Sequence, residues 1–346
     1  MKADTKAQVM PTSGKKKLLS VEDLKVSFRS GDKTALAVDG LNFEVHHGET
    51  VCIVGESGCG KTVSSLAILG LIPRPPGRIE QGAIFFAGRD LLRLQEDELC
   101  LIRGKQIGMI FQDPLTSLNP VFTVKEQIQE TILAHEILEQ KDIEPRLFEL
   151  LQNVGLPSPE TTLRSYPHQL SGGQRQRVMI AMAMSCDPKL IIADEPTTAL
   201  DVTVQAQIIK LFKSTVQDGS RSILYITHDL GVVANLAQRV YVMYAGLIVE
   251  QGPVREILRN PGHPYTQGLL ASLPGTGKRG SLLPSIPGTV PAPSRRPPGC
   301  PFHPRCSIRQ DSCVLQRPGL EAIKSGHFSR CPVLIRGEPE ERTGLL

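Results

Sequence analysis

The chain has 346 residues, of which 40% are hydrophobic and 21% charged, and its net charge is +4. These values are typical of a globular protein and exclude a disordered or collagen-like chain. No basic stripe with interleaved aromatic residues occurs, so nucleic-acid binding is not indicated. The longest apolar runs are far shorter than the roughly 20 residues that span a bilayer, so any role at a membrane is expected to work through partners.

The first part of the chain reads as a tail followed by strands. Residues 1–18 contain a lysine cluster but no apolar core before a cleavage site, and we interpret them as a flexible tail, not a secretory signal. The next residues alternate between apolar and polar and end in the apolar run Thr50–Val54, which predicts a buried strand. A glycine-rich loop follows at once. Helical spacing then extends over residues 62–71 and stops before Pro73.

The middle of the chain predicts a helical insertion within an α/β domain. Residues 123–152 are rich in Glu, Gln and Leu with helical periodicity, and we assign the insertion to about 113–170. Apolar runs at Leu190–Ala193 and Ser222–Thr227 predict buried strands of a parallel sheet. Pro and Gly dominate residues 274–304, which indicates a linker or an irregular module. We therefore expect one domain over residues 19–259 and a second over 260–346.

The glycine-rich loop carries a phosphate-binding motif. Residues 55–62, Gly-Glu-Ser-Gly-Cys-Gly-Lys-Thr, match G-x-x-x-x-G-K-[ST] between a predicted strand and a predicted helix. Backbone N–H groups of such a loop bind phosphates, Lys61 reaches the β- and γ-phosphates of ATP, and the Thr62 hydroxyl ligates Mg²⁺. A plain glycine-rich turn is the alternative. The expected ATP-binding residues here are Gly55, Glu56, Ser57, Gly58, Cys59, Gly60, Lys61, Thr62 and Val63.

Two adjacent carboxylates end the strand that starts at Leu190. Successive side chains of a strand point in opposite directions, so Asp194 and Glu195 are expected to have different roles. We expect Asp194 to hold Mg²⁺ and Glu195 to polarise the attacking water as the general base. A solvated acidic turn is the alternative interpretation.

Residues 170–177, Leu-Ser-Gly-Gly-Gln-Arg-Gln-Arg, resemble the signature of the ATP-binding cassette (ABC) ATPases. The resemblance implies an α/β P-loop fold with a RecA-like core, an antiparallel β subdomain and an α-helical subdomain. It also implies that Ser171, Gly172, Gly173 and Gln174 bind the ATP of an opposing subunit, so that hydrolysis requires a closed dimer. A turn that opens a helix presents N–H donors to phosphate, which agrees with this role.

Other elements of the family follow in order. Gln112 resembles the Q-loop glutamine, close to Mg²⁺, Asp201 lies in a D-loop-like Ala-Leu-Asp, and His228 resembles the switch histidine. Phe28 lies where the family has its adenine-stacking aromatic residue. Taken singly, each of these side chains also suits a structural role. Cys59 departs from the commonest P-loop, which has Ser there, and a thiol beside phosphates is expected to be sensitive to oxidation.

Residues 111–120 and 263–266 are similar to the ATPase subunits of dipeptide, oligopeptide and nickel importers. This resemblance implies a peripheral protein on the cytoplasmic face of the inner membrane. Its partners would be a second homologous ATPase, two membrane permease subunits and, indirectly, an extracytoplasmic substrate-binding protein. Peptides are the expected cargo, with nickel or another small solute as the alternative. A non-transport ABC ATPase acting on DNA or ribosomes, and a redox or regulatory iron–sulfur protein that only retains ATP binding, are the other function classes.

Four of the eight cysteines crowd into the last 47 residues, at Cys300, Cys306, Cys313 and Cys331. Four thiolates are the ligand set of a [4Fe-4S] cluster, and a Pro/Gly-rich segment of this kind cannot bury a core unaided. We therefore expect a small irregular C-terminal domain held by such a cluster. Zinc is the alternative metal, although Cys₄ zinc sites favour C-x₂₋₄-C pairs, which do not occur here. Unligated thiols and disulfides are the remaining possibilities.

Overall fold

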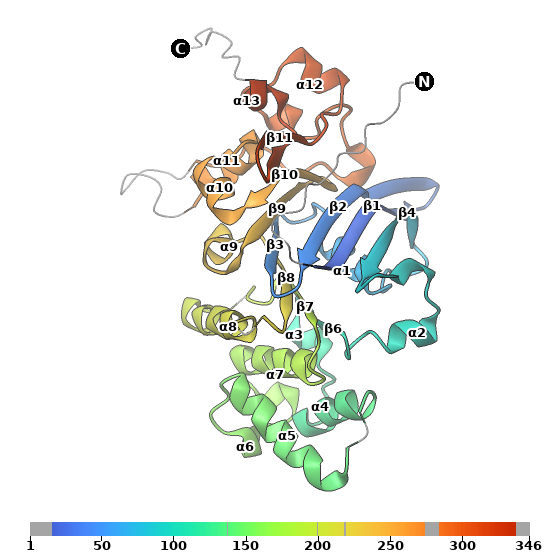
Figure 1. Cartoon of the computed structure of the whole chain (residues 1–346), viewed down its shortest axis with the longest axis vertical. Helices are drawn as coiled ribbons and strands as arrows, with labels where there is room; N and C mark the ends of the chain where they lie inside the picture. Colours follow the sequence, from blue (N-terminus) through green and yellow to red (C-terminus); the bar gives the residue numbers. More distant parts are fainter. Residues whose placement is uncertain (1–15, 137, 199, 218, 274–283, 337–346) are drawn as a thin grey trace.

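The structure is a computed structural model that describes residues 16–136, 138–198, 200–217, 219–273 and 284–336 (Figure 1). Most of the tail predicted for residues 1–18 lies outside the described residues, but Lys17 and Leu18 already belong to the first strand. Among the described residues, no helix is long and apolar enough to cross a membrane.

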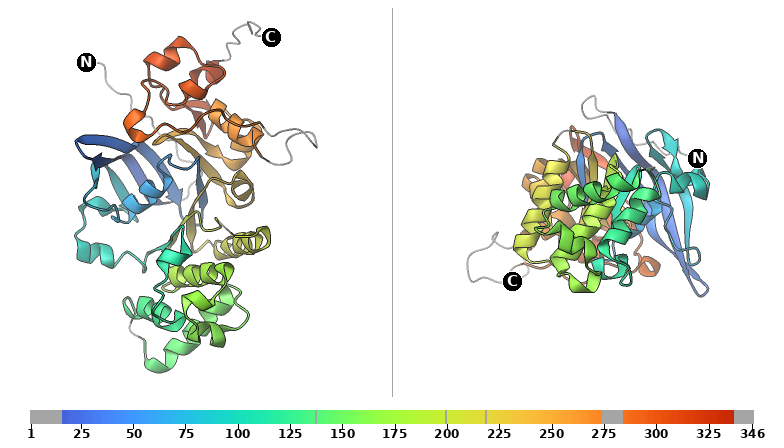
Figure 2. Two further views of the ribbon diagram at one scale, coloured as in Figure 1. Left: turned by 180° about the vertical axis from the view of Figure 1, so that it is seen from behind. Right: turned by 90° about the horizontal axis from the view of Figure 1, so that it is seen from below.

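A four-stranded antiparallel sheet forms one side of the molecule, in the order β2-β1-β4-β5. Apolar side chains of the long strands, such as Val26, Val38 and Ile84, are buried in the core beneath this sheet. The strands are β1 Lys17–Ser30, β2 Lys33–His46, β4 Gly77–Phe86 and β5 Arg89–Asp90. Both views of Figure 2 show this blue sheet on the side opposite the yellow helices.

The central sheet has eight strands in the order β11-β12-β10-β9-β3-β8-β7-β6. Its strands are β3 Thr50–Val54, β6 Ile107–Ile110, β7 Leu190–Asp194, β8 Ser222–Thr227, β9 Arg239–Tyr244, β10 Leu247–Pro253, β11 Glu321–Lys324 and β12 His327–Ser329. The pairs from β9 through β3, β8 and β7 to β6 are parallel, and the pairs formed by β10 are antiparallel.

Both faces of the central sheet are covered, which explains the continuous apolar runs of its strands. On β3, Val51 and Ile53 pack in the core under the antiparallel sheet, whereas Cys52 and Val54 pack in the core on the opposite face. The helices beside this sheet are α1 Lys61–Ile68, α8 Val202–Thr215, α9 Leu230–Leu236 and α10 Val254–Arg259. The predicted strands from Thr50, Leu190 and Ser222 are confirmed, and β7 extends one residue further than predicted, to Asp194.

The predicted insertion is helical and lies at the end of the molecule away from the C-terminal region (Figure 1). Its helices are α3 Pro114–Ser117, α4 Val124–Leu133, α5 Gln140–Asn153 and α6 Pro159–Arg164, followed by α7 Gly172–Met184. Helix α4 begins with a capping box, in which Thr123 and Glu126 satisfy each other's backbone N–H groups. Short elements elsewhere are η1 Leu91–Arg93, α2 Glu96–Cys100 and η2 Pro167–Gln169.

The C-terminal region is attached to the central sheet. Strand β12 pairs with β10, and β11 pairs with β12, so the region extends the sheet at its edge. The prediction of a separate small, irregular Cys-rich domain is therefore not supported, and the boundary near Asn260 stays a prediction. The remaining elements are α11 Pro264–Ala271, η3 Pro293–Arg295, η4 His303–Arg305, α12 Asp311–Leu315 and α13 Pro332–Arg336.

Candidate nucleotide-binding site

The glycine-rich loop connects β3, which ends at Val54, to α1, which begins at Lys61. Gly58 and Gly60 have φ angles of 80° and 108°, in the left-handed region that favours glycine. A Cβ atom at Gly60 would also lie 2.8 Å from the carbonyl oxygen of Ala37. The path of the loop thus requires glycine at this position. Ser57 and Gly58 are exposed, so the outer side of the loop is open to a ligand.

Lys61 lies between the loop and the end of β7. Its ammonium donates hydrogen bonds to the carbonyl oxygens of Gly55 and Glu56, at 2.8 and 3.1 Å, and lies 3.5 Å from Oε1 of Glu195. The Thr62 side chain is exposed and Val63 is half-buried beside it. The cation is therefore held by the loop whose phosphate-binding role the motif predicts.

Asp194 ends β7 and is 1% exposed. Its Oδ2 atom accepts a hydrogen bond of 3.5 Å from the Ser65 hydroxyl, while Oδ1 has no hydrogen-bond partner. Burial raises the pKa of this carboxyl above its usual range, and the hydrogen bond from Thr62 opposes the shift. A buried carboxylate oxygen without a hydrogen-bond partner suits a hard cation such as Mg²⁺.

Glu195 gathers the predicted catalytic side chains. Its Oε2 atom lies 3.0 Å from Nδ1 of His228 and 3.4 Å from Nε2 of Gln112. The Thr198 hydroxyl donates a further hydrogen bond to Oε2, at 3.1 Å, and sequence analysis missed this residue. The φ angle of Glu195 is 47°, so a non-glycine residue is held in the left-handed region. Such strained backbone concentrates at functional sites.

The other predicted site residues lie apart from this cluster. Ser171 is the N-cap of α7 and forms a capping box with Gln174, and Asp201 is the N-cap of α8. The hydrogen bonds described for Ser171 and Asp201 stay within the first turn of their own helices. A Cβ atom at Gly172 would meet no atom within 4 Å, whereas one at Gly173 would lie 3.1 Å from the Val204 side chain. The first turn of α7 is thus open to contact by another molecule.

Phe28 lies on β1 and is half-buried against the core beneath the antiparallel sheet. Its ring lies beside Gly77, where a Cβ atom would approach Cε1 of Phe28 to 2.9 Å. The ring therefore leans on the first residue of strand β4.

Cys59 points into the core and not toward the open side of the loop. The residue is 1% exposed, and burial raises the pKa of its thiol to about 11. A buried thiol with such a pKa is almost entirely protonated at neutral pH. The expected sensitivity to oxidation does not fit this environment.

Two side chains of the C-terminal region reach the P-loop, and sequence analysis assigned neither to the site. The Tyr265 hydroxyl accepts a hydrogen bond of 2.8 Å from the backbone N–H of Glu56. The Arg305 guanidinium contacts both carboxylate oxygens of Glu56, at 2.6 and 3.0 Å. His263 is the N-cap of α11, and its Nδ1 accepts a hydrogen bond from the N–H of Tyr265. Burial lowers the pKa of His263 to about 3, so the ring is neutral.

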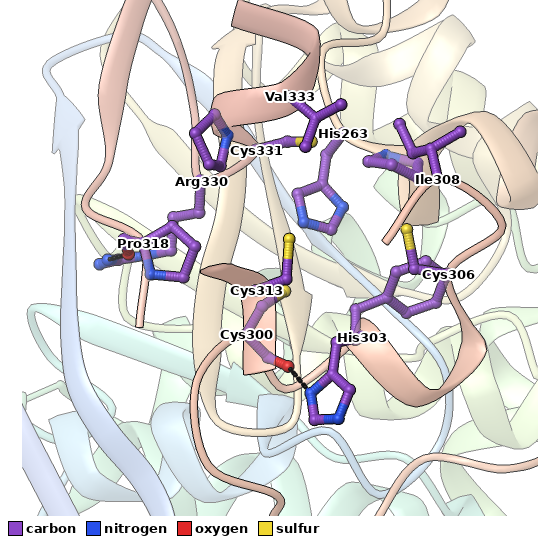
Figure 3. A pocket seen from close by; sticks show the side chains of 13 residues that line it. His263, Cys300, His303, Cys306, Ile308, Cys313, Pro318, Arg330, Cys331 and Val333 are labelled. Carbon is purple, nitrogen blue, oxygen red and sulfur yellow. Dashed lines mark hydrogen bonds between the residues drawn. The ribbon is translucent and has the colours of Figure 1, made fainter. Parts of the chain in front are cut away.

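The four C-terminal cysteines line a single pocket (Figure 3). Cys300, Cys313 and Cys331 are buried, and Cys306 is half-buried at the other side of the pocket. Within the described parts of the chain, however, no three His, Cys, Asp or Glu side chains are arranged to hold a metal ion. The predicted zinc or [4Fe-4S] site is therefore not supported by this geometry.

Two family models match the chain. The ABC transporter model covers residues 38–198, and the model of the oligopeptide/dipeptide transporter C-terminal region covers residues 249–313. The second match includes Tyr265 and Arg305, which contact the P-loop. The chain thus combines a cassette with the C-terminal region of one group of transporters.

Relatives and solved structures agree with these matches. The oligopeptide transport ATP-binding protein AppD of Bacillus subtilis is 50% identical, over 91% of this chain and 96% of its own. The dipeptide transport ATP-binding protein DppD of Bacillus subtilis is 48% identical, over 91% of this chain and 94% of its own. A dimeric ATP-binding cassette bound to ADP and Pi is 28% identical, with a TM-score of 0.62 over 68% of this chain and 99% of its own. A cassette of the cbiONQ transporter complex from Clostridium perfringens is 27% identical, with a TM-score of 0.60 over 70% of this chain and 91% of its own.

The solved cassettes confirm the predicted ABC ATPase fold. The relatives match this chain along nearly their whole length. An identity of half the residues over nine tenths of both chains leaves no room for a different fold or a partial match. The chain belongs to the ABC transporter family, in the group of the oligopeptide and dipeptide transport ATP-binding proteins.

Proposed function

We propose that the chain binds and hydrolyses ATP to power the import of dipeptides or oligopeptides. The observation that carries the enzymatic part is the convergence of Lys61, Gln112 and His228 on the carboxylate of Glu195, at the mouth of the P-loop. The relatives named for oligopeptide and dipeptide transport support the cargo.

In this proposal the side chains around Glu195 divide the chemistry of hydrolysis. Glu195 accepts the proton of the attacking water, because a carboxylate can take up a proton, whereas the Gln112 amide and the Thr198 hydroxyl that contact it cannot do so at neutral pH. Gln112 and His228 hold the carboxylate and sense the γ-phosphate. Lys61 exchanges part of its hydrogen bonding to two carbonyl oxygens for contacts with the β- and γ-phosphates, which its charge stabilises.

Residues on either side of the loop would hold the Mg²⁺ ion and the adenine of ATP. Thr62 and Asp194, with Gln112 nearby, would hold Mg²⁺, which neutralises phosphate charge. Phe28 would stack on the adenine. The exposed first turn of α7, Ser171 to Gln174, together with Asp201, would contact the ATP of a facing subunit, because helix N-termini bind phosphate.

The partners follow from the same model. We propose a second homologous ATPase, two membrane permeases and, indirectly, an extracytoplasmic binding protein, with this chain peripheral on the cytoplasmic face of the inner membrane. One of the solved cassettes named above is a dimer, which supports pairing of cassettes. Nickel or another small solute is the alternative cargo.

We also propose a [4Fe-4S] cluster in the cysteine pocket, with zinc as the alternative. The support is that four thiols from distant positions line one pocket with apolar neighbours such as Phe302 and Val333. Each thiolate of such a cluster binds a different iron, so the sulfur atoms do not need to meet at one point, as they do around zinc. Metal analysis of protein purified without oxygen tests this: we expect about four irons per chain. Stoichiometric zinc, or no metal, would refute the cluster.

The test of the function is a reconstituted transporter. The chain, its co-purified permeases and the binding protein are placed in liposomes, and uptake of labelled peptide and release of phosphate are measured together. We expect both to require the peptide-loaded binding protein and to fail with Lys61→Ala. ATP hydrolysis that depends on nickel and not on peptide would identify nickel as the cargo. Full activity of the lone chain on DNA or ribosomes would place it in another function class.

A further inference from the structure

Arg305 is a buried cation aimed at the P-loop from the C-terminal region. Its side chain is 7% exposed, and its two terminal nitrogens form a fork on the carboxylate of Glu56, whose side chain is 28% exposed. The Nε atom donates to the carbonyl oxygen of Pro287, at 2.8 Å. A planar guanidinium held at both ends has one orientation, so it fixes the carboxylate that it binds.

The backbone of Glu56 is held from the same side. Its N–H group donates to the Tyr265 hydroxyl, and Tyr265 is fully buried. The rings of Tyr265, Tyr244 and Phe302 pack together with centroids 4.7 to 5.5 Å apart, and Arg305 lies over Tyr244 and Phe302. Aromatic pairs and cation–π contacts at these distances are attractive. Side chain and backbone of one loop residue therefore rest on a packed support outside the loop.

This support reaches the predicted phosphate-binding lysine in one further step. The carbonyl oxygens of Gly55 and Glu56 are the acceptors that hold the Lys61 ammonium. A shift of the peptide at Glu56 would move both this acceptor and the cation. The carboxylate of Glu56 is also a negative charge in a loop that binds phosphates, and Arg305 neutralises it.

We propose that Arg305 is a positioning residue of the nucleotide site, which acts through Glu56 on the P-loop and on Lys61. The C-terminal region thereby becomes part of the ATP-binding unit and not only an addition to it. The proposal rests on the proposed role of the P-loop as the ATP site. Arg305 itself touches no phosphate: it sets the geometry and the charge of the loop that does.

A double-mutant cycle on the full-length chain tests this pathway, with Mg-ATP affinity measured by equilibrium titration. Arg305→Gln leaves the Glu56 carboxylate without its partner, and we expect ATP to bind roughly tenfold more weakly. Glu56→Gln breaks the same fork from the other side. It should also weaken ATP binding, but by less than Arg305→Gln does, because it leaves no unpaired negative charge in the loop. The double variant should then bind like Glu56→Gln alone, because residues that act through each other are not additive.

Arg296→Gln is the matched control. Arg296 is also a buried arginine of the C-terminal region, 11% exposed, but it pairs with Asp39 and the carbonyl oxygen of Leu36 and not with the P-loop. We expect its ATP affinity to stay within about twofold of the wild type, even if its melting temperature falls. In the assembled transporter, Arg305→Gln should raise KM for ATP more than it lowers kcat, as expected for an interaction made equally in the ground and transition states.

The outcomes separate this inference from the proposed function. Unchanged affinity of Arg305→Gln, additive losses in the cycle, or an equal loss in Arg296→Gln would overturn the positioning role while the wild type still binds ATP. If the wild type does not bind ATP, or if Lys61→Ala binds it as tightly as the wild type, the P-loop assignment fails, and the inference fails with it.

Discussion

Glu195→Gln removes the proposed general base with the least change of shape. The amide keeps the size of the carboxylate, and its oxygen can still accept hydrogen bonds from Thr198 and His228. The Lys61 ammonium, 3.5 Å from Oε1, would no longer face a negative charge. Positioned general bases contribute about 10² to 10⁴ in rate. Because each factor of ten is about 1.36 kcal/mol, the loss corresponds to roughly 2.7 to 5.4 kcal/mol of transition-state stabilisation.

ATP affinity should respond in the opposite sense to turnover. Glu195 is an anion beside the proposed γ-phosphate position, so its neutralisation should leave Mg-ATP binding as tight as in the wild type or tighter. The assay pairs phosphate release by the reconstituted transporter with ATP titration of the isolated chain. Thr198→Val is a control that removes one hydrogen bond to Oε2 without removing the base.

Two results would refute the assignment. Turnover of the Glu195→Gln transporter within a factor of about three of the wild type would show that no essential proton acceptor sits at this position. An equally large loss in Thr198→Val would show that the shape of the cluster and not the carboxylate limits the rate.

Three further predictions concern the partner surfaces and the P-loop thiol. The isolated chain should hydrolyse ATP slowly, with a specific activity that rises with protein concentration, since the first turn of α7 is expected to serve a facing subunit; concentration-independent turnover would contradict this. Val121 and Phe122 of the helical insertion are 71% and 45% exposed, and exposed apolar groups suit a permease contact. The double variant Val121→Ser, Phe122→Ser should therefore lower peptide uptake and leave ATP binding intact. Unchanged uptake would show that the permease contact lies elsewhere. At pH 8 iodoacetamide should modify the exposed Cys100 first and leave Cys59 unreacted in the folded chain, since the pKa of about 11 leaves only about 10⁻³ of Cys59 as thiolate. Peptide mass spectrometry measures the labelling of both cysteines. Fast labelling of Cys59 would contradict its burial.

The parts that sequence analysis predicted well are those whose signal is contiguous. The apolar run Thr50–Val54 followed by the glycine-rich motif has one structural meaning, and β3 and α1 appear with the loop between them. The run from Leu190 predicts its own strand, and the strand brings Asp194 and Glu195 to the loop. The helical insertion was found from its periodicity and composition, although its individual helices were not.

The parts that it missed depend on contacts between distant residues. Arg305 and Glu56 are 249 positions apart, and neither shows a local pattern that points to the other. The Cys59 side chain was expected beside the phosphates because its neighbours bind them, but the turn of the loop directs its sulfur into the core. Strands β11 and β12 are short, and all four residues of β11 are exposed, so no apolar alternation announces them.

Ionisable side chains join the C-terminal region to the cassette, and their contacts restrict how the two parts can move relative to each other. Glu250 on β10 and His327 on β12 are both fully buried and lie 2.7 Å apart. Asp39 on β2 meets Arg296 and Arg317, and Glu56 meets Arg305. Separating these pairs would leave the buried carboxylates of Asp39 and Glu250 without their partners, which is strongly unfavourable. Moving this region while β10 and β2 stay in place would break these pairs, and Arg305, which directly precedes Cys306, links the cysteine pocket to Glu56 of the P-loop.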